Sequence, residues 1–294
     1  MKVLDLTNSE KSDIKYKISR FPDGQQSIAL DLENTPFEPG SQSVTIKSRL
    51  NSFLDLELII CANQALIELG TKSKALKPDE IALYVPYFIG ARSDRKFLSG
   101  QSNYLKTVIC PIINSQGFSR VTVLDPHSDV LEACIDRFDK ASNVSFAETA
   151  IKYYAGKGEE VTLVSPDAGA LKKIYDVAKA IKCSDVIVAN KLRDMETGKI
   201  IRTEVPGISE DAGSKKFVIC DDICDGGRTF IEIAKAIRYI RPKSIYNDSI
   251  YLCVTHGIFS AGFEELEKYF DAIFCTNSVK DLEQTGLVKQ FNVF

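Results

Sequence analysis

The sequence predicts an α/β protein in which mainly parallel sheets are covered by helices. Short apolar runs recur along the chain, and segments with apolar residues at helical spacing lie between them, an alternation typical of parallel sheets. The runs are continuously apolar, as strands buried on both faces are. One run leads into an acidic, glycine-rich segment, at the position where such sheets collect their ligands.

Six apolar runs are expected to form strands. They lie at residues 81–85, 121–124, 161–164, 186–189, 217–220 and 250–254. Between these runs, one helical stripe consists of Leu171, Ile174, Ala178 and Ile181, and another includes Ile231, Ala234 and Ile237. We expect both stripes to face the core.

The length leaves room for two domains. The 294 residues include 44% hydrophobic side chains, enough to give each domain a core. A Lys-Gly-Glu turn near Gly158 and the segment before it separate two sets of strands and helices. We therefore expect one domain at residues 1–145 and a second at residues 146–294.

The charge balance favours small-molecule partners. The chain has 37 basic and 40 acidic side chains and a net charge of -3, so no nucleic-acid or membrane partner is expected. No apolar stretch reaches the roughly 18 residues that span a bilayer, and the first residues are too polar for a signal peptide. We expect a cytoplasmic protein, located in the host cytoplasm if the chain is viral.

The eight cysteines are expected to be reduced core thiols. Most lie inside apolar runs, where a free thiol behaves as a small hydrophobic group. Cys220 and Cys224 flank an acidic pair and lack the spacing with histidine that a zinc site requires.

Residues 217–229, FVICDDICDGGRT, contain the most specific chemical signal. The neighbouring carboxylates Asp221 and Asp222 suit vicinal hydroxyl groups. Gly226 and Gly227 allow backbone N–H groups to point at one anion, and Thr229 adds a hydroxyl where the dipole of the next helix favours negative charge. The segment therefore predicts a cradle for a phosphorylated sugar, with an acidic turn that ends in a helix cap as the alternative.

This segment resembles the phosphoribosyl-pyrophosphate binding loop shared by phosphoribosyltransferases and ribose-phosphate pyrophosphokinases. Residues 21–25 (FPDGQ) and 86–96 (PYFIGARSDRK) are similar to pyrophosphokinase motifs in the first half of the chain, which the transferases lack. Further similar motifs follow in the family's order at residues 125–128, 165–169, 190–193, 255–260 and 276–277. The chain is identified by this resemblance as a divergent member of the ribose-phosphate pyrophosphokinase family.

The resemblance implies two phosphoribosyltransferase-like domains and a specific reaction. The β,γ-diphosphoryl group of ATP, the co-substrate, passes to the anomeric hydroxyl of ribose 5-phosphate, which gives phosphoribosyl pyrophosphate and AMP. Such transfer depends on positioning and charge neutralisation, with Mg²⁺ as the implied cofactor. The first domain is expected to carry the ATP motifs, and the second the sugar-phosphate loop and a catalytic flap.

The resemblance also assigns roles to individual residues. The ribose-phosphate site would consist of Asp221, Asp222, Asp225, Gly226, Gly227, Arg228 and Thr229. ATP would be held by Phe21, Asp23, Gln25, Arg92, Ser93 and His127. Because the family's ATP residues lie partly across a subunit boundary, we expect a homo-oligomer, either a dimer or a hexamer.

The catalytic and metal-site residues follow from the same resemblance. Lys191 and Arg193 match the cation pair on the family's mobile loop, here residues 194–214 with their preceding strand, although a plain charged surface loop is the alternative. His127 is expected to be both catalytic and, with Asp167, part of the metal site. A capping or buried ring is the alternative for His127, and His256 suits a structural or a site-lining role equally.

Departures from the family pattern suggest a second acceptor. Gln25 replaces a glutamate, Ser93 a glutamine, Gly226 a threonine and Arg228 a glycine. The arginine suits a diphosphate, so the alternative substrate is ADP-ribose, as in the ADP-ribose pyrophosphate synthetases of viral NAD-rebuilding pathways, which the chain also resembles. The segment after His127 lacks the family's usual residues, and allosteric control tied to it is not expected.

A catalytically silent regulatory paralogue is the alternative from another functional class. The retention of His127, Asp167, Lys191, Arg193 and Asp221 argues against it. A simple phosphoribosyltransferase would not need the ATP motifs of the first half.

Overall fold

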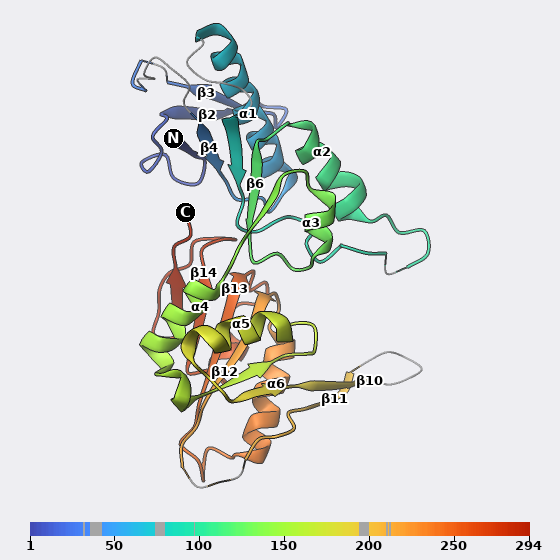
Figure 1. Ribbon diagram of the computed structural model, residues 1–294, viewed down its shortest axis with the longest axis vertical. Helices are drawn as coiled ribbons and strands as arrows, with labels where there is room; N and C mark the ends of the chain where they lie inside the picture. Colours follow the sequence, from blue (N-terminus) through green and yellow to red (C-terminus); the bar gives the residue numbers. More distant parts are fainter. Residues whose placement is uncertain are drawn as a thin grey trace. The chain divides into compact units, whose positions relative to one another are not determined.

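The protein divides into two compact units (Figure 1). The computed structural model describes residues 1–31, 33–35, 43–73, 80–96, 98–193, 200–209, 211 and 213–294. Unit 1 consists of Met1–Ser142 with Phe294, and unit 2 consists of Asn143–Val293. This division lies close to the boundary expected near residue 145, while the functional role assigned to each domain stays a prediction.

Unit 1 contains a five-stranded sheet in which every neighbouring pair of strands is parallel. Its order is β1 (Lys2–Asp5), β4 (Val44–Lys47), β5 (Ile81–Tyr84), β6 (Arg120–Leu124) and β7 (Phe138–Ala141). An antiparallel hairpin of β2 (Tyr16–Arg20) and β3 (Gln26–Leu30) accompanies it. The helices are α1 (Phe53–Ser73), the π-helix η2 (Leu105–Ile109), α2 (Cys110–Ser115) and α3 (Val130–Cys134).

Unit 2 contains a six-stranded, fully parallel sheet. Its order is β15 (Val288–Phe291), β14 (Ala272–Thr276), β13 (Ser249–Gly257), β12 (Lys216–Cys224), β8 (Val161–Ser165) and β9 (Val186–Val188). The helices are α4 (Val144–Ala150), η3 (Ile151–Ala155), η4 (Gly158–Glu160), α5 (Leu171–Ile181), α6 (Arg228–Ile240) and α7 (Glu264–Glu267). A separate hairpin pairs β10 (Asn190–Arg193) with β11 (Ile200–Glu204).

Helices cover both faces of the unit 2 sheet. Because successive side chains of a strand point to opposite faces, β12 contributes to two apolar clusters. Phe217 and Ile219 pack in one cluster with the apolar stripe of α6, whereas Val218 and Cys220 pack in the other with α4 and α5. This layering fixes the helices against the strands whose carboxyl ends form the candidate site.

The fold class and the main elements are confirmed. All six apolar runs are strands, and the two helical stripes form α5 and α6. One boundary differs, since β12 continues beyond Cys220 to Cys224. The acid pair therefore lies within the last part of the strand and not after it, because Ile223 and Cys224 still pair with His256 and Gly257 of β13.

The thiols agree with the expected reduced state. All eight cysteines are free, and six of them are buried. Within the described residues, we find no helix with the length and apolar character that crossing a membrane requires.

Candidate functional site

The sugar-phosphate loop connects β12 to the first turn of α6. Gly227 precedes the helix with a φ of +78°, in the left-handed region that favours glycine. A Cβ atom there would also lie 3.0 Å from Cδ2 of Leu266. The residue type is thus required by both the backbone and the packing, and the turn directs the chain into the 13-residue helix α6.

The beginning of α6 has the properties of an anion site. The first N–H groups of a helix lack partners within the helix, and the helix dipole adds positive potential there. The helix begins at Arg228, so Thr229 is its second residue and not its opening one. Gly226 and Arg228 are exposed and Thr229 is partly buried, which leaves this turn open to a phosphate.

The acid pair, Asp221 and Asp222, lies near the carboxyl end of β12, a few residues before that turn. Asp222 is 5% exposed, and its Oδ2 atom lies 3.2 Å from Nζ of Lys173 on α5. Asp221 accepts a hydrogen bond from the Asp222 N–H at 2.9 Å. Burial, and then the neighbouring charge of Asp222, raise the pKa of Asp221 well above its usual range, with a smaller contribution from Asp167.

Asp225 is oriented from a neighbouring loop. The Oγ of Ser260 donates a hydrogen bond to Oδ1 of Asp225 at 2.5 Å. The N–H groups of Ile258 and Phe259 donate to the carbonyl of Cys224 at 2.8 and 3.2 Å. Through these hydrogen bonds, the segment after β13 holds the end of β12 and the first residue of the sugar-phosphate loop in position.

Asp167 lies on the loop between β8 and α5. Its Oδ1 atom accepts hydrogen bonds from the N–H groups of Gly169 and Ala170 at 3.0 and 3.2 Å, and its carbonyl accepts one from the Ser165 hydroxyl at 2.7 Å. Since β8 and β12 are parallel neighbours, their carboxyl ends meet at the same edge of the sheet. The effect of Asp167 on the pKa of Asp221 agrees with this proximity.

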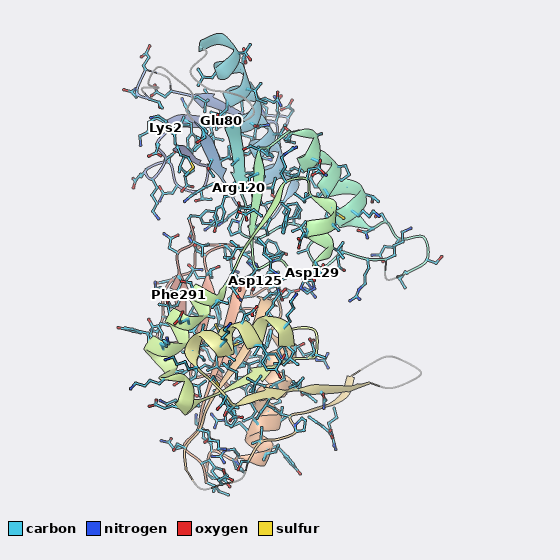
Figure 2. All side chains as sticks on the ribbon, in the orientation of Figure 1. Lys2, Glu80, Arg120, Asp125, Asp129 and Phe291 are labelled. Atoms are coloured by element: carbon cyan, nitrogen blue, oxygen red, sulfur yellow. The ribbon has the colours of Figure 1, made fainter. Side chains whose placement is uncertain are left out.

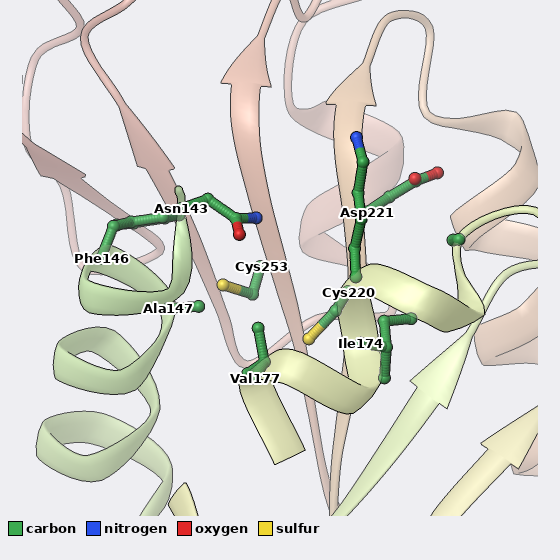
Figure 3. A pocket seen from close by; sticks show the side chains of 10 residues that line it. Asn143, Phe146, Ala147, Ile174, Val177, Cys220, Asp221 and Cys253 are labelled. Carbon is green, nitrogen blue, oxygen red and sulfur yellow. The ribbon is translucent and has the colours of Figure 1, made fainter. Parts of the chain in front are cut away.

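A small cavity lies beside the acid pair (Figure 3). Its volume of about 10 Å³ suits about one water molecule, and it is too small for a sugar. Its lining includes Asn143, Lys173, Asp221, Cys220 and Cys253. The cavity therefore belongs to the packing around Asp221 and is not itself a sugar site.

The donor atoms of unit 2 fit a hard cation such as Mg²⁺. Asp167, which follows β8, supplies carboxylate oxygens, and its expected partner His127 belongs to unit 1. Mg²⁺ usually takes one or two carboxylates, water and substrate phosphates. In the described part of the chain, no three His, Cys, Asp or Glu side chains are grouped closely enough to hold a metal.

His127 belongs to unit 1, where it follows β6. It is exposed, whereas Asp125 just before it is 2% exposed and has a φ of +44° (labelled in Figure 2). This exposure contradicts the buried-ring alternative, while the capping alternative stays open. Its catalytic, ATP and metal roles stay predictions.

The other expected ATP residues lie on two loops of unit 1. Phe21, Asp23 and Gln25 form the turn of the β2–β3 hairpin, in which the Phe21 N–H donates to the Gln25 carbonyl at 2.8 Å. The Phe21 ring is 51% exposed, as an adenine platform requires. Arg92 and Ser93 follow β5 on the second loop. Their ATP contacts stay predictions.

The expected flap begins with the β10–β11 hairpin. Lys191 pairs in register with Thr203, and Arg193 with Ile200. The side chains of Lys191 and Arg193 lie outside the described part of the structure, as do residues 194–199, 210 and 212. Their proposed catalytic role therefore rests on the sequence resemblance.

His256 has a structural environment. It is 2% exposed, and its Nδ1 atom lies 2.8 Å from Oγ of Ser278. The Ser278 and Thr276 hydroxyls in turn donate to the carbonyl of Thr255 at 3.3 and 2.6 Å. This buried network favours the structural alternative over a site-lining role.

Sequence reasoning missed Lys173 and assigned no role to Ser260. A signal for Lys173 was present, since it precedes Val177 by four residues and so lies along the stripe that α5 buries. A lysine on such a stripe, in the first turn of a helix, indicates an internal ion pair. Ser260 lay inside a recognised motif, but its partner could not be read from the motif.

Comparisons with known proteins agree with this geometry. The family profile described as Phosphoribosyl transferase domain matches residues 140–289. The chain is 29% identical to a ribose-phosphate pyrophosphokinase of Hyphomonas neptunium over 79% of this chain and 73% of that protein. It is 26% identical to the Vibrio vulnificus protein of the same name, over 94% of this chain and 83% of the relative.

The whole chain also shares a fold with a solved structure. Phosphoribosylpyrophosphate synthetase from Mycobacterium smegmatis superposes with a TM-score of 0.74 at 16% identity, covering 100% of this chain and 95% of that one. The chain thus belongs to the phosphoribosyl transferase domain family. Within that family, its relatives over most of its length make it a divergent member of the ribose-phosphate pyrophosphokinases.

Proposed function

We propose that this diphosphokinase-type transferase moves the β,γ-diphosphoryl group of ATP to the anomeric hydroxyl of ribose 5-phosphate. One observation carries the proposal. Four residues after Asp222, a glycine turn begins that leads into α6, so hydroxyl acceptors and a phosphate cradle lie close together in one segment. Relatives over most of the chain are named ribose-phosphate pyrophosphokinase, which supports the same substrate.

The proposed roles follow from the chemistry of each group. Asp221 and Asp222 accept hydrogen bonds from the ribose 2- and 3-hydroxyls, and Asp225 adds a third carboxylate next to them. The N–H groups from Gly226 to Thr229 hold the 5-phosphate at the beginning of α6. This arrangement fixes the sugar, so that its anomeric hydroxyl is positioned before reaction.

The bond changes are those of a single displacement. A bond forms between the anomeric oxygen and the β-phosphorus of ATP. The bond from that phosphorus to the oxygen shared with the α-phosphate breaks, and that oxygen leaves with AMP. The hydroxyl proton passes to solvent.

Charge neutralisation is the remaining requirement. Lys191 and Arg193 stabilise the charge that develops on the transferred group and the leaving oxygen. Mg²⁺, which Asp167 and His127 help to hold, would neutralise the ATP oxygens. Phe21, Asp23, Gln25, Arg92 and Ser93 bind ATP in this proposal. A homo-oligomer in the cytoplasm is part of the same expectation.

A second acceptor is favoured by one residue. Arg228 is exposed at the first position of α6, beside the phosphate cradle. A guanidinium group there suits two phosphate oxygens at once, as a diphosphate-substituted ribose would present. The same chemistry on ADP-ribose would give ADP-ribose pyrophosphate for NAD salvage.

The test is AMP release from ATP and Mg²⁺ with each acceptor supplied separately. We expect rapid AMP formation with ribose 5-phosphate, and loss of turnover in Lys191→Ala without a comparable loss of ATP binding. Preference for ADP-ribose would replace the first proposal with the second. AMP with neither acceptor would contradict both and favour the silent regulatory paralogue.

A further inference from the structure

The ion pair between α5 and β12 lies directly behind the sugar-phosphate loop. Its members, Lys173 and Asp222, are 49 residues apart in the sequence. We propose that Lys173 is a positioning residue, whose ammonium group holds the carboxylate of Asp222 in one orientation for the sugar diol. This inference rests on the proposed function of the acid pair as the ribose-binding element.

The geometry supports a fixed contact. Nζ of Lys173 lies 3.2 Å from Oδ2 of Asp222, with side chains that are 24% and 6% exposed. At such low exposure, water screens the pair only weakly. An ion pair at the surface contributes little, whereas this pair is largely removed from water.

The local charge explains why a cation is needed. Asp221 and Asp222 are adjacent on β12, and Asp167 is near enough to contribute to the raised pKa of Asp221. Three carboxylates at one sheet edge repel one another, and burial adds a further cost to each charged form. The ammonium of Lys173 offsets this repulsion at Asp222.

The helix that carries Lys173 is itself well anchored. Ile174, Val177, Ala178 and Ile181 of α5 are buried in the cluster that includes Val218 and Cys220 of β12. The helix therefore cannot shift without disturbing the core, and it presents the ammonium group at a set position. Lys173 also lines the cavity of about 10 Å³ whose lining includes Asp221.

A neighbouring lysine provides a matched control. Lys172 is the preceding residue of the same helix and is exposed. Replacing Lys172 changes the net charge of the protein by the same amount as replacing Lys173. A general electrostatic effect would appear in both variants, but a positioning effect would appear in Lys173 variants alone.

The expected change is in sugar binding and not in the chemical step. Without the Lys173 contact, the carboxylate of Asp222 loses its fixed orientation, and the diol loses one well-placed acceptor. In Lys173→Met, we expect KM for ribose 5-phosphate to rise about 10-fold or more. KM for ATP and kcat are expected to change by less than about 3-fold, because ATP binding and the flap cations are untouched.

The experiment compares steady-state kinetics of wild type, Lys173→Met, Lys173→Arg and Lys172→Met. Arginine keeps the charge, so Lys173→Arg is expected to recover most of the affinity for ribose 5-phosphate, and Lys172→Met to match wild type. An unchanged sugar KM in Lys173→Met, or an equal loss in the arginine variant, would overturn the proposal. If Lys173→Met does not fold, Lys173→Gln answers the same question.

Calorimetric binding separates this proposal from the proposed function. Ribose 5-phosphate and ADP-ribose are each titrated into wild type and Lys173→Met without ATP. Binding by wild type that weakens about 10-fold or more in the variant supports the positioning role, even where no AMP is released. Equal affinity in both proteins contradicts it, and so does the absence of binding to wild type.

Discussion

Two internal ion pairs of unit 2 differ in how completely their charges are satisfied. Arg241 and Asp248 are both 0% exposed in their side chains, with Nε of the arginine 2.7 Å from Oδ2 of the aspartate. Lys173 and Asp222 make a contact of 3.2 Å at partial exposure, beside a second carboxylate. The first pair is completely buried, and the second borders the candidate site.

Arg241 is surrounded by acceptors. Its Nη2 atom donates to Oδ1 of Asp248 at 3.0 Å and to the carbonyl of Gly213 at 2.6 Å. Its Nη1 atom donates to the carbonyls of Ser209 and Asp211 at 2.9 and 3.1 Å. The pair therefore fastens the segment that follows the β10–β11 hairpin to the end of α6.

The pKa shifts of the carboxyl groups reflect this difference. At Asp248, burial alone would raise the pKa, but hydrogen bonds from Arg241 and from the Lys215 N–H outweigh it, so the pKa is lowered. At Asp221, burial and the charge of Asp222 raise the pKa. Strong compensation of a buried charge favours stability, whereas a raised carboxyl pKa caused by burial and a neighbouring acid is more typical of functional sites.

The largest effect is expected where the fully satisfied pair is broken. Arg241→Met should lower the free energy of unfolding by about 3–5 kcal/mol, because it leaves the buried Asp248 charge without a partner. Activity per folded molecule should stay near that of wild type. Urea unfolding and active-site titration measure the two quantities. Lys268→Met, which removes an exposed pair with Glu265, is the control and should leave the unfolding midpoint unchanged.

The acid pair should behave in the opposite way. Asp221→Asn is expected to reduce kcat/KM for the ribose phosphate about 10²- to 10³-fold, since a charged acceptor for the sugar is lost. Its unfolding free energy should be equal to or greater than that of wild type, because a poorly compensated charge is removed. If Asp221→Asn lowers the unfolding free energy as well as the activity, the proposed difference between the two ion pairs is contradicted.

A smaller effect is expected at the edge of the phosphate cradle. Arg228→Gly should weaken the use of ADP-ribose about 10-fold and spare ribose 5-phosphate, because a charged hydrogen bond to the second phosphate is lost. Competition between the two acceptors in one reaction measures this ratio directly. If both acceptors are affected equally, Arg228 has no part in discriminating between them.

The smallest effect is a pH dependence of stability. Because the pKa of Asp248 is lowered in the folded protein, its stabilisation is fully present above the unfolded value of about 3.9. It is lost as the pH falls through the lower, folded value. Unfolding curves of wild type and Asp248→Asn between neutral and acidic pH should show this loss in wild type and not in the variant.

Much of the fold could be predicted because its signal is local. Continuous apolar runs identified β5, β6, β8, β9, β12 and β13, and helical stripes identified α5 and α6. Strand β7 was missed because this edge strand exposes Asp139 and Lys140 and has no apolar run. The end of β12 was misplaced because its two acids interrupt an apolar pattern that continues in Ile223 and Cys224.

The candidate site divides in the same way. The acid pair and the glycine turn lie only a few residues apart in the chain, so sequence reasoning identified them together. Lys173 comes to Asp222 from 49 residues away, through the packing of α5 on β12. Asp248 is seven residues from Arg241. The backbone carbonyls that accept from the guanidinium, however, come from the segment that follows the β10–β11 hairpin. Pairing of this kind depends on tertiary packing, which no local pattern describes.

The most direct test of the proposed function uses ATP radiolabelled at either its β or its γ phosphorus, with ribose 5-phosphate and Mg²⁺. Diphosphoryl transfer predicts that both labels appear in the sugar product in equal amounts, with unlabelled AMP released. Label from the γ position alone would indicate transfer of a single phosphoryl group. That result would contradict the assignment of this chain as a pyrophosphokinase.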